Sequence, residues 1–134
     1  MATIAEIMGL GLCYICKKWK RVDDNGRCGT CRNHIQRQKK ILARNPHWLK
    51  MLELSNGCCI SCGQPTEVYT VDHIIPLSIE WNWDIQNLQP LCSNCNNRKG
   101  ERIIDFRPGW WFPVLEEVID EDSDSPVTFN ISGI

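Results

Sequence analysis

The spacing of apolar residues predicts two consecutive helices in the middle of the chain. Residues 32–43 form a basic stretch in which Ile35 and Leu42 share one helical face. Asn45 ends this helix, because the residue before a proline avoids the α region and the proline suits the first turn of a new helix. The second helix is expected over residues 46–54, with its apolar side chains facing a core.

A different pattern follows, typical of strands. Residues 67–75 are rich in β-branched and aromatic side chains, and residues 87–91 form a short, mostly apolar run. We expect these two segments to pair as a hairpin and a helix to start at Ser93 and run through Lys99. The order of strand, loop, strand and helix predicts a small α+β fold.

The remaining segments carry weaker signals. Residues 1–12 are expected to form a short helical turn, and residues 116–124 an acidic helix end that runs into a tail. Tryptophans occur in the loop at residues 78–86, and an aromatic run covers residues 110–112. We expect both groups to cover the core, although contact of the loop tryptophans with nucleic-acid bases is an alternative.

Charge is distributed unevenly along the 134 residues, although the net charge is only −1. Residues 17–50 are dense in Lys and Arg, whereas residues 108–134 hold acids and no Lys or Arg. A basic block of this density favours nucleic acid as a partner, because phosphates supply most non-specific affinity. The acidic tail is either solubilising or a mimic of DNA charge. The residues expected to contact nucleic acid are Arg37, Lys39, Lys40, Arg44, Arg98 and Lys99.

The nine cysteines indicate metal sites rather than a disulfide scaffold. Eight of them fall into Cys-x-x-Cys pairs, which is metal-ligand spacing, and the odd count argues against full pairing. Four cysteines in two pairs can close a tetrahedral zinc site. With no recognisable signal peptide and no apolar run of about 20 residues, we expect a cytoplasmic, reducing location and no membrane association. The two structural zinc sites are expected at Cys13, Cys16, Cys28 and Cys31, and at Cys59, Cys62, Cys92 and Cys95.

Four further polar residues lie among the second set of cysteines and are candidates for chemistry. His73 is a candidate general base, since a neutral imidazole can accept a proton at pH 7. Asp72 and Asn96 offer oxygen ligands that suit Mg²⁺ or Mn²⁺. Asn87 is a candidate for orienting the loop and the imidazole. Adjacent residues on a strand point to opposite faces, so a distorted strand end or a different approach is needed for Asp72 and His73 to act together.

These residues carry a family resemblance. Residues 59–99 resemble the HNH endonuclease family through four motifs, namely Cys-x-x-Cys, Asp-His-x-x-Pro-Leu, Asn-Leu-Gln-Pro-Leu-Cys and Cys-x-x-Cys-Asn-x-x-Lys. Asn96 stands where the second histidine of the name would fall, so the chain is similar to the His-Asn-Asn variants found in RNA-guided CRISPR nucleases. The resemblance implies a ββα-metal (His-Me finger) core, His73 as general base, one catalytic metal ion, and products with 5′-phosphate and 3′-hydroxyl ends.

These observations predict a four-part organisation and a function. We expect an N-terminal four-cysteine zinc module (1–33), a basic helical linker (34–56), an HNH nuclease core (57–107) and an aromatic segment with an acidic tail (108–134). The expected activity is that of a DNA endonuclease or nickase acting on duplex DNA, with phage, mobile-element and restriction enzymes among its relatives. A monomer would nick, and a dimer would cut both strands. The alternatives are a non-catalytic zinc-finger protein that binds nucleic acid and a protein-interaction adaptor.

Overall fold

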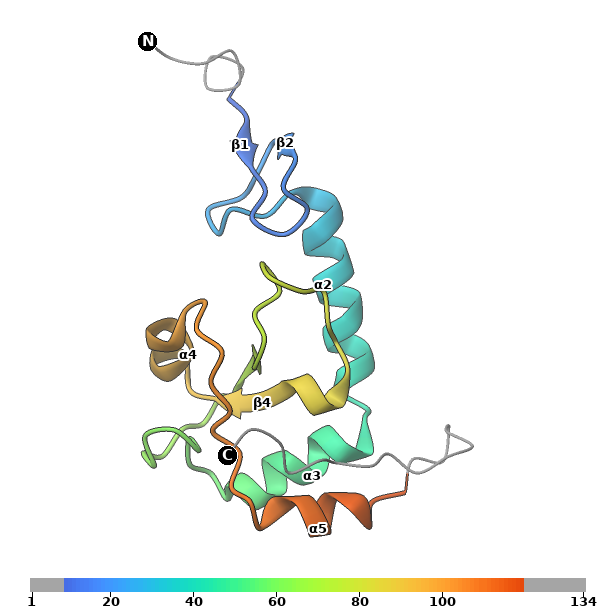
Figure 1. Ribbon diagram of the computed structural model, residues 1–134, viewed down its shortest axis with the longest axis vertical. Helices are drawn as coiled ribbons and strands as arrows, with labels where there is room; N and C mark the ends of the chain where they lie inside the picture. The colour runs from blue at the N-terminus through green and yellow to red at the C-terminus, as the bar shows by residue number, and fades with distance from the viewer. Residues whose placement is uncertain (1–8, 120–134) are drawn as a thin grey trace.

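The computed structural model describes residues 9–119, in which helix α2 joins an upper module to a larger lower one (Figure 1). In the upper module, strands β1 (Gly11–Leu12) and β2 (Trp19–Lys20) pair antiparallel and lead into α2 (Gly29–Leu42). The helical turn expected over residues 1–12 is therefore wrong at Gly11–Leu12, and residues 1–8 lie outside the described part. The boundary expected between residues 33 and 34 falls inside α2.

The two predicted helices are separated just before the proline, as the sequence predicts. Helix α3 (Pro46–Ser55) starts with proline in its first turn, and the side chain of Asn45 accepts hydrogen bonds from the backbone of His47 and Trp48 at 2.9 and 3.2 Å. This is an N-cap, which satisfies amide groups that have no partner within the helix. The helix ends at Asn56, whose φ of 52° places it in the left-handed region that terminates helices.

The predicted hairpin and the helix after it form the second module. Strands β3 (Thr70–His73) and β4 (Leu88–Leu91) pair antiparallel, with Thr70 opposite Leu91 and His73 opposite Leu88. Both strands are shorter than predicted, and Asn87 belongs to the 3-10 turn η1 (Ile85–Asn87) instead of β4. Helix α4 (Ser93–Lys99) has the predicted bounds. The small α+β fold is therefore confirmed.

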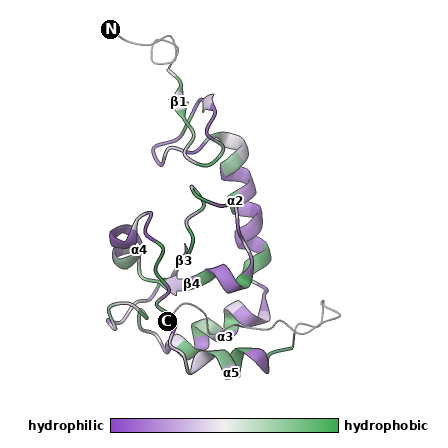
Figure 2. Ribbon diagram, viewed as in Figure 1, coloured by the Kyte–Doolittle hydropathy of each residue, from purple (hydrophilic) through white to green (hydrophobic). Residues whose placement is uncertain are grey.

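The apolar core lies below the hairpin, between β4, α3 and α5 (Trp111–Glu116). Figure 2 shows apolar residues on α3 and α5, whereas α2 is mostly hydrophilic. The aromatic run packs on this core as expected through Trp111 and Phe112, but Trp110 is 60% exposed. Of the acidic helix end expected over residues 116–124, only Glu116 belongs to α5, and residues 117–119 follow the helix. Residues 120–134, with most of the expected acidic tail, lie outside the described part.

Helices within residues 9–119 are all too short or too polar to cross a membrane.

Candidate functional site

Each cysteine quartet is drawn together in space. The sulfur atoms of Cys13, Cys16, Cys28 and Cys31 lie within 4.8 Å of one another, and so do those of Cys59, Cys62, Cys92 and Cys95. Cys59, and not its neighbour Cys58, belongs to the second quartet. Four sulfur donors at this spacing form the ligand set of a structural zinc ion, so the residues fit the metal that their spacing predicts.

The electrostatics of the sulfurs supports a cation at each centre. Burial opposes ionisation of Cys59, but backbone N–H groups, including those of Cys92 at 3.3 Å and Ser61 at 3.4 Å, outweigh it and lower its pKa to about 6. Burial, together with the neighbouring cysteine sulfurs, raises the pKa of Cys95 to about 12. Four thiolates can therefore coexist here only around a positive ion.

The second quartet brings the start of α4 to residues 59–62, and the residue after Cys95 links the helix to β3. Cys92 is the N-cap of α4 and Cys95 lies in its first turn, so a metal held by both would anchor the start of the helix. The next residue, Asn96, donates from its amide nitrogen to the Thr70 hydroxyl at 2.9 Å. This bond leaves the amide oxygen of Asn96 as the atom able to meet a cation.

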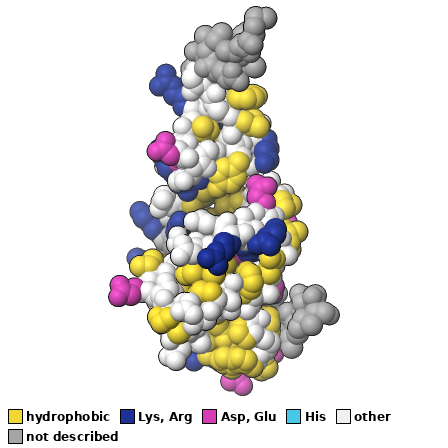
Figure 3. All heavy atoms as spheres, turned by 90° about the vertical axis from the view of Figure 1, so that its left-hand side faces the viewer, with side chains coloured by type: hydrophobic (Ala, Val, Ile, Leu, Met, Phe, Trp, Pro, Cys, Tyr) yellow, Lys and Arg dark blue, Asp and Glu magenta, His cyan; other side chains and the backbone are white. Residues whose placement is uncertain are grey.

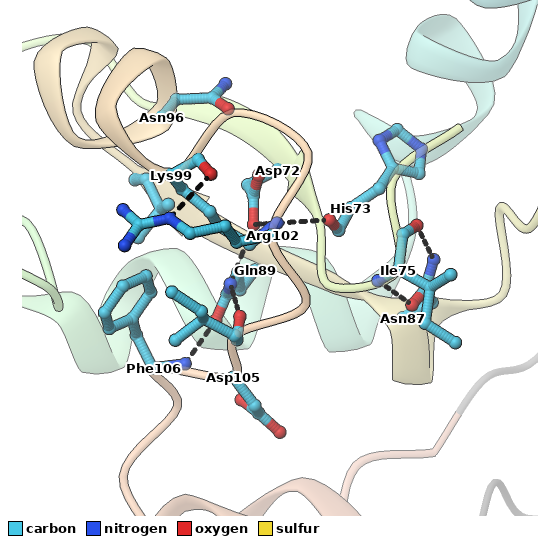
Figure 4. Close-up of polar contacts among 12 residues, drawn as sticks. Asp72, His73, Ile75, Asn87, Gln89, Asn96, Lys99, Arg102, Asp105 and Phe106 are labelled. Carbon is cyan, nitrogen blue, oxygen red and sulfur yellow. Dashed lines mark hydrogen bonds and ion pairs between the residues drawn. The ribbon is translucent and has the colours of Figure 1, made fainter. Parts of the chain in front are cut away.

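A buried polar network ties α4 to the end of β3 (Figure 4). The ammonium of Lys99 lies 3.3 Å from the Asp72 carboxylate and donates to the carbonyl oxygen of His73 at 2.8 Å. Gln89 donates to the same Asp72 oxygen, Oδ2, at 2.7 Å. The backbone of residues 104–106 holds Gln89 in turn, through hydrogen bonds with Ile104 O and Phe106 N.

This network corrects one prediction. The sequence places Lys99 among the nucleic-acid contacts, but its side chain is only 1% exposed and its ammonium faces the protein interior. A buried ammonium is stable only when carboxylate and carbonyl oxygens replace its water, and Asp72 and His73 supply them here. Lys99 therefore positions the end of β3 and is not available as a surface contact.

Asp72 and His73 point to opposite faces of the ribbon and nevertheless line one pocket. In the register, Asp72 lies opposite Gln89, with which it bonds, whereas His73 lies opposite Leu88. In the part of the chain that the structure describes, this sheet consists of β3 and β4, so β3 is an edge strand there. A pocket of about 240 Å³ is lined by Asp72, His73 and Asn96. Side chains from both faces of β3 therefore border the same space.

The imidazole of His73 is held by packing. Its ring meets that of Trp83 edge-on, with 4.3 Å between ring centroids, and its buried Nε2 has no hydrogen-bond partner among residues 9–119. Burial lowers the pKa of His73 to about 4, and the positive charges of Lys99 and Lys39 act in the same direction. The ring is therefore neutral at pH 7 and able to accept a proton.

Asn87 organises the loop that carries Trp83. Its amide oxygen accepts from the backbone N–H of Ile75 at 2.9 Å, and its amide nitrogen donates to the carbonyls of Ile75 and Asn82 at 3.1 and 3.0 Å. The side chain thus joins the two ends of the loop after β3. It acts on the His73 ring only through the backbone, while Trp83 makes the direct contact.

The basic residues expected to meet nucleic acid are divided between surfaces. Lys39 lines the His73 pocket, whereas Arg37, Lys40 and Arg44 line a separate groove of about 750 Å³ at the end of α2. Arg98 is exposed on α4. The space-filling view shows a hollow between the upper and lower modules, with Lys and Arg side chains above and below it (Figure 3).

Sequence reasoning missed the roles of Gln89, Trp83 and Lys99 in this site. Only the position of Gln89 within an apolar strand was a signal, since a polar side chain there needs buried partners.

The comparison with protein families agrees with this geometry. The HNH endonuclease family model matches residues 59–102, which contain the second quartet and Asp72, His73, Asn87 and Asn96. The resemblance seen in the sequence is therefore confirmed for this part of the chain. No match was found among curated proteins or among solved structures.

Proposed function

We propose that this protein is a metal-dependent DNA endonuclease or nickase that hydrolyses a phosphodiester bond in the pocket of His73. One observation carries the proposal. A buried, neutral imidazole shares a pocket with a carboxylate and an amide, within the segment that matches HNH endonucleases.

His73 is the general base in this proposal. It accepts a proton from the water that attacks phosphorus, and its neutral state at pH 7 leaves it ready to do so. Its low pKa limits its strength as a base in the free protein. The negative charge of a bound phosphate raises the pKa of a nearby imidazole, so substrate binding would strengthen the base.

Asp72 and Asn96 are the proposed ligands of a divalent ion. Within the described residues, the contacts of the Asp72 carboxylate with Gln89 and Lys99 both end on Oδ2, so Oδ1 is free of them, and the amide nitrogen of Asn96 is occupied by Thr70. Among the residues described, only the two cysteine quartets bring three or more His, Cys, Asp or Glu ligands together. An ion at Asp72 would therefore keep water ligands, as Mg²⁺ and Mn²⁺ commonly do. Such an ion stabilises the charge that develops on the phosphate and on the leaving oxygen.

The two cysteine quartets are proposed to hold structural zinc. Zinc with four thiolate ligands has no open position for substrate, so these ions take no part in hydrolysis. Cys28 and Cys31 at the start of α2, and Cys92 and Cys95 at the start of α4, would hold these ions, and Asn96 and Lys99 follow on α4.

A non-catalytic nucleic-acid-binding protein is the second candidate, favoured by the basic groove at Arg37, Lys40 and Arg44. Binding alone needs no buried Lys99–Asp72 pair and no imidazole in a pocket, and these features favour the enzyme.

Incubation with supercoiled plasmid and added Mg²⁺ or Mn²⁺ tests the proposal. The wild-type protein should give nicked or linear DNA, and His73→Ala should lower the rate by about 10²–10⁴-fold because a general base contributes that much. His34→Ala removes an exposed histidine and is the matched control. Both variants should keep two zinc ions per chain. Intact plasmid with the wild type, or equal cleavage by His73→Ala, would refute the proposed activity.

A further inference from the structure

The pocket of His73 is built by both halves of the chain. Its lower wall comes from β3, the following loop and α4, and includes Asp72, His73 and Asn96. The rest of its lining includes Tyr14 and Arg27 from the N-terminal module, and Ile35 and Lys39 from α2. The segment matched by the HNH family model begins at residue 59, so these four residues lie outside it.

The charges in the pocket are divided in the same way. Among its lining residues in the described part of the chain, the two cations are Arg27 and Lys39, and the two acids are Asp72 and Glu101. Lys99 of α4 is buried outside this lining, where its ammonium faces Asp72 and the His73 carbonyl. Among the described residues that line the pocket, a phosphate therefore meets positively charged side chains only from the N-terminal half.

Arg27 is held in place for such a contact. Its Nε lies 3.4 Å from Asp23 Oδ2, and its backbone N–H donates to the other Asp23 oxygen at 3.0 Å. No contact within the described residues ends on its two terminal nitrogens, which leaves these donors for a ligand. A guanidinium fixed on one side is well suited to bind phosphate oxygens with its free edge.

Lys39 lines the pocket from α2. It lies one helical turn after Ile35 on α2, and its side chain is exposed. Its charge is felt at the imidazole, as one of the causes that lower the pKa of His73. A flexible ammonium at this place can follow a phosphate without itself being fixed.

We propose that Arg27 and Lys39 each bind one of two neighbouring backbone phosphates of duplex DNA at the His73 pocket, so that the N-terminal zinc module forms part of the substrate-binding site. The proposal rests on the proposed function for the identity of the substrate. It does not extend to Arg37, Lys40 and Arg44, which line a separate groove at the C-terminal end of α2.

The salt dependence of DNA binding tests the proposal. Fluorescence anisotropy with a labelled duplex, without added Mg²⁺ or Mn²⁺, gives the binding constant at several salt concentrations. Each phosphate contact contributes about 0.9 to the slope of log K against log salt, so Arg27→Gln and Lys39→Gln should each lower this slope by about 0.9. The double variant should lower it by about twice that amount. Lys50→Gln, which removes one charge from α3 outside the pocket, should keep the wild-type slope.

Zinc content and circular dichroism establish that each variant is folded. Because Lys39 is an exposed helix residue, its variant remains informative even if Arg27→Gln disturbs the N-terminal module. A Lys39→Gln slope equal to that of Lys50→Gln would overturn the inference. Plasmid cleavage is scored separately. Lowered slopes without cleavage by the wild type would refute the nuclease activity alone, whereas cleavage with unchanged slopes would refute the phosphate contact alone.

Discussion

Each cysteine quartet supplies two residues at the start of a helix, and the two helices differ one turn later. Cys28 is the N-cap of α2, with Cys31 in its first turn, and Cys92 and Cys95 occupy the same places in α4. One turn after the second cysteine, both helices bury a side chain. In α2 it is Ile35 and in α4 it is Lys99, with 3% and 2% of the residue exposed.

This difference shows how one scaffold serves two purposes. Ile35 is buried and apolar, so its position in α2 contributes packing alone. The helix also places a basic residue, Lys39, beside the pocket. Lys99 cannot be buried without partners, and it meets Asp72 and the His73 carbonyl. The same helix start therefore becomes part of a chemical site when the buried position is charged.

The surroundings of the two quartets also differ. The first cluster contains its own cysteines with Ile15 and Val22 against it, whereas the second includes Leu91 and lies beside Phe106. The large apolar core is built from α3, β4 and α5. A zinc ion bound by the first quartet would therefore contribute more to the folding of its module than one bound by the second, because so small a cluster buries little apolar surface.

The largest expected effect follows from loss of one quartet. Cys16→Ser should release one zinc ion and unfold the N-terminal module while the second module stays folded, since structural zinc contributes on the order of 10 kcal/mol. Cys62→Ser should release the other zinc ion, free α4 and abolish cleavage. Metal analysis and limited proteolysis distinguish these outcomes. A protease-resistant core of the same size in both variants would show that the two modules do not differ in this way.

Substitution at the buried position of each helix should have the next largest effect. Lys99→Met leaves Asp72 buried without its partner and should lower the free energy of unfolding by about 3–5 kcal/mol. Ile35→Met, the same change in α2, should cost less than about 1.5 kcal/mol, because it conserves volume and polarity. Urea denaturation measures both.

The same two variants distinguish an effect on stability from an effect on cleavage. Lys99→Met should also slow plasmid cleavage, since the end of β3 loses its link to α4, and adding Asp72→Asn should restore part of the stability but no activity. Equal losses of stability in Lys99→Met and Ile35→Met would show that the buried charge does not distinguish α4 from α2.

Substitution of the side chains that hold loops in place should have the smallest effect on stability. Asn87→Ala removes three hydrogen bonds from a buried side chain and should lower stability by about 1–3 kcal/mol. Asp23 anchors the turn of the N-terminal module through the N–H groups of Asn25 and Arg27, closer to solvent. Asp23→Ala should lower the stability less than Asn87→Ala, since water replaces the lost acceptor. Thermal unfolding of the two variants checks the order, and a larger loss for Asp23→Ala would reverse it.

The sequence by itself determined the features that depend on neighbouring residues. The Cys-x-x-Cys pairs set both quartets, Pro46 set the break between α2 and α3, and the order of segments predicted the hairpin and α4. These signals are local, because a proline or a metal-binding turn acts on the few residues around it. The same applies to His73, Asp72 and Asn96, whose types and order indicated a site before any contact was known.

Only the tertiary structure decided which of these residues meet. Lys99 and His73 are 26 positions apart, and Gln89 and Asp72 are 17 apart, so no local pattern reveals their hydrogen bonds. The placement of Lys39 in the pocket, apart from Arg37 on the same helix, depends on how α2 lies against the hairpin. The physical reason is burial. A charged side chain takes a role in the interior or at the surface according to the partners that packing brings to it, and packing is a property of the whole fold.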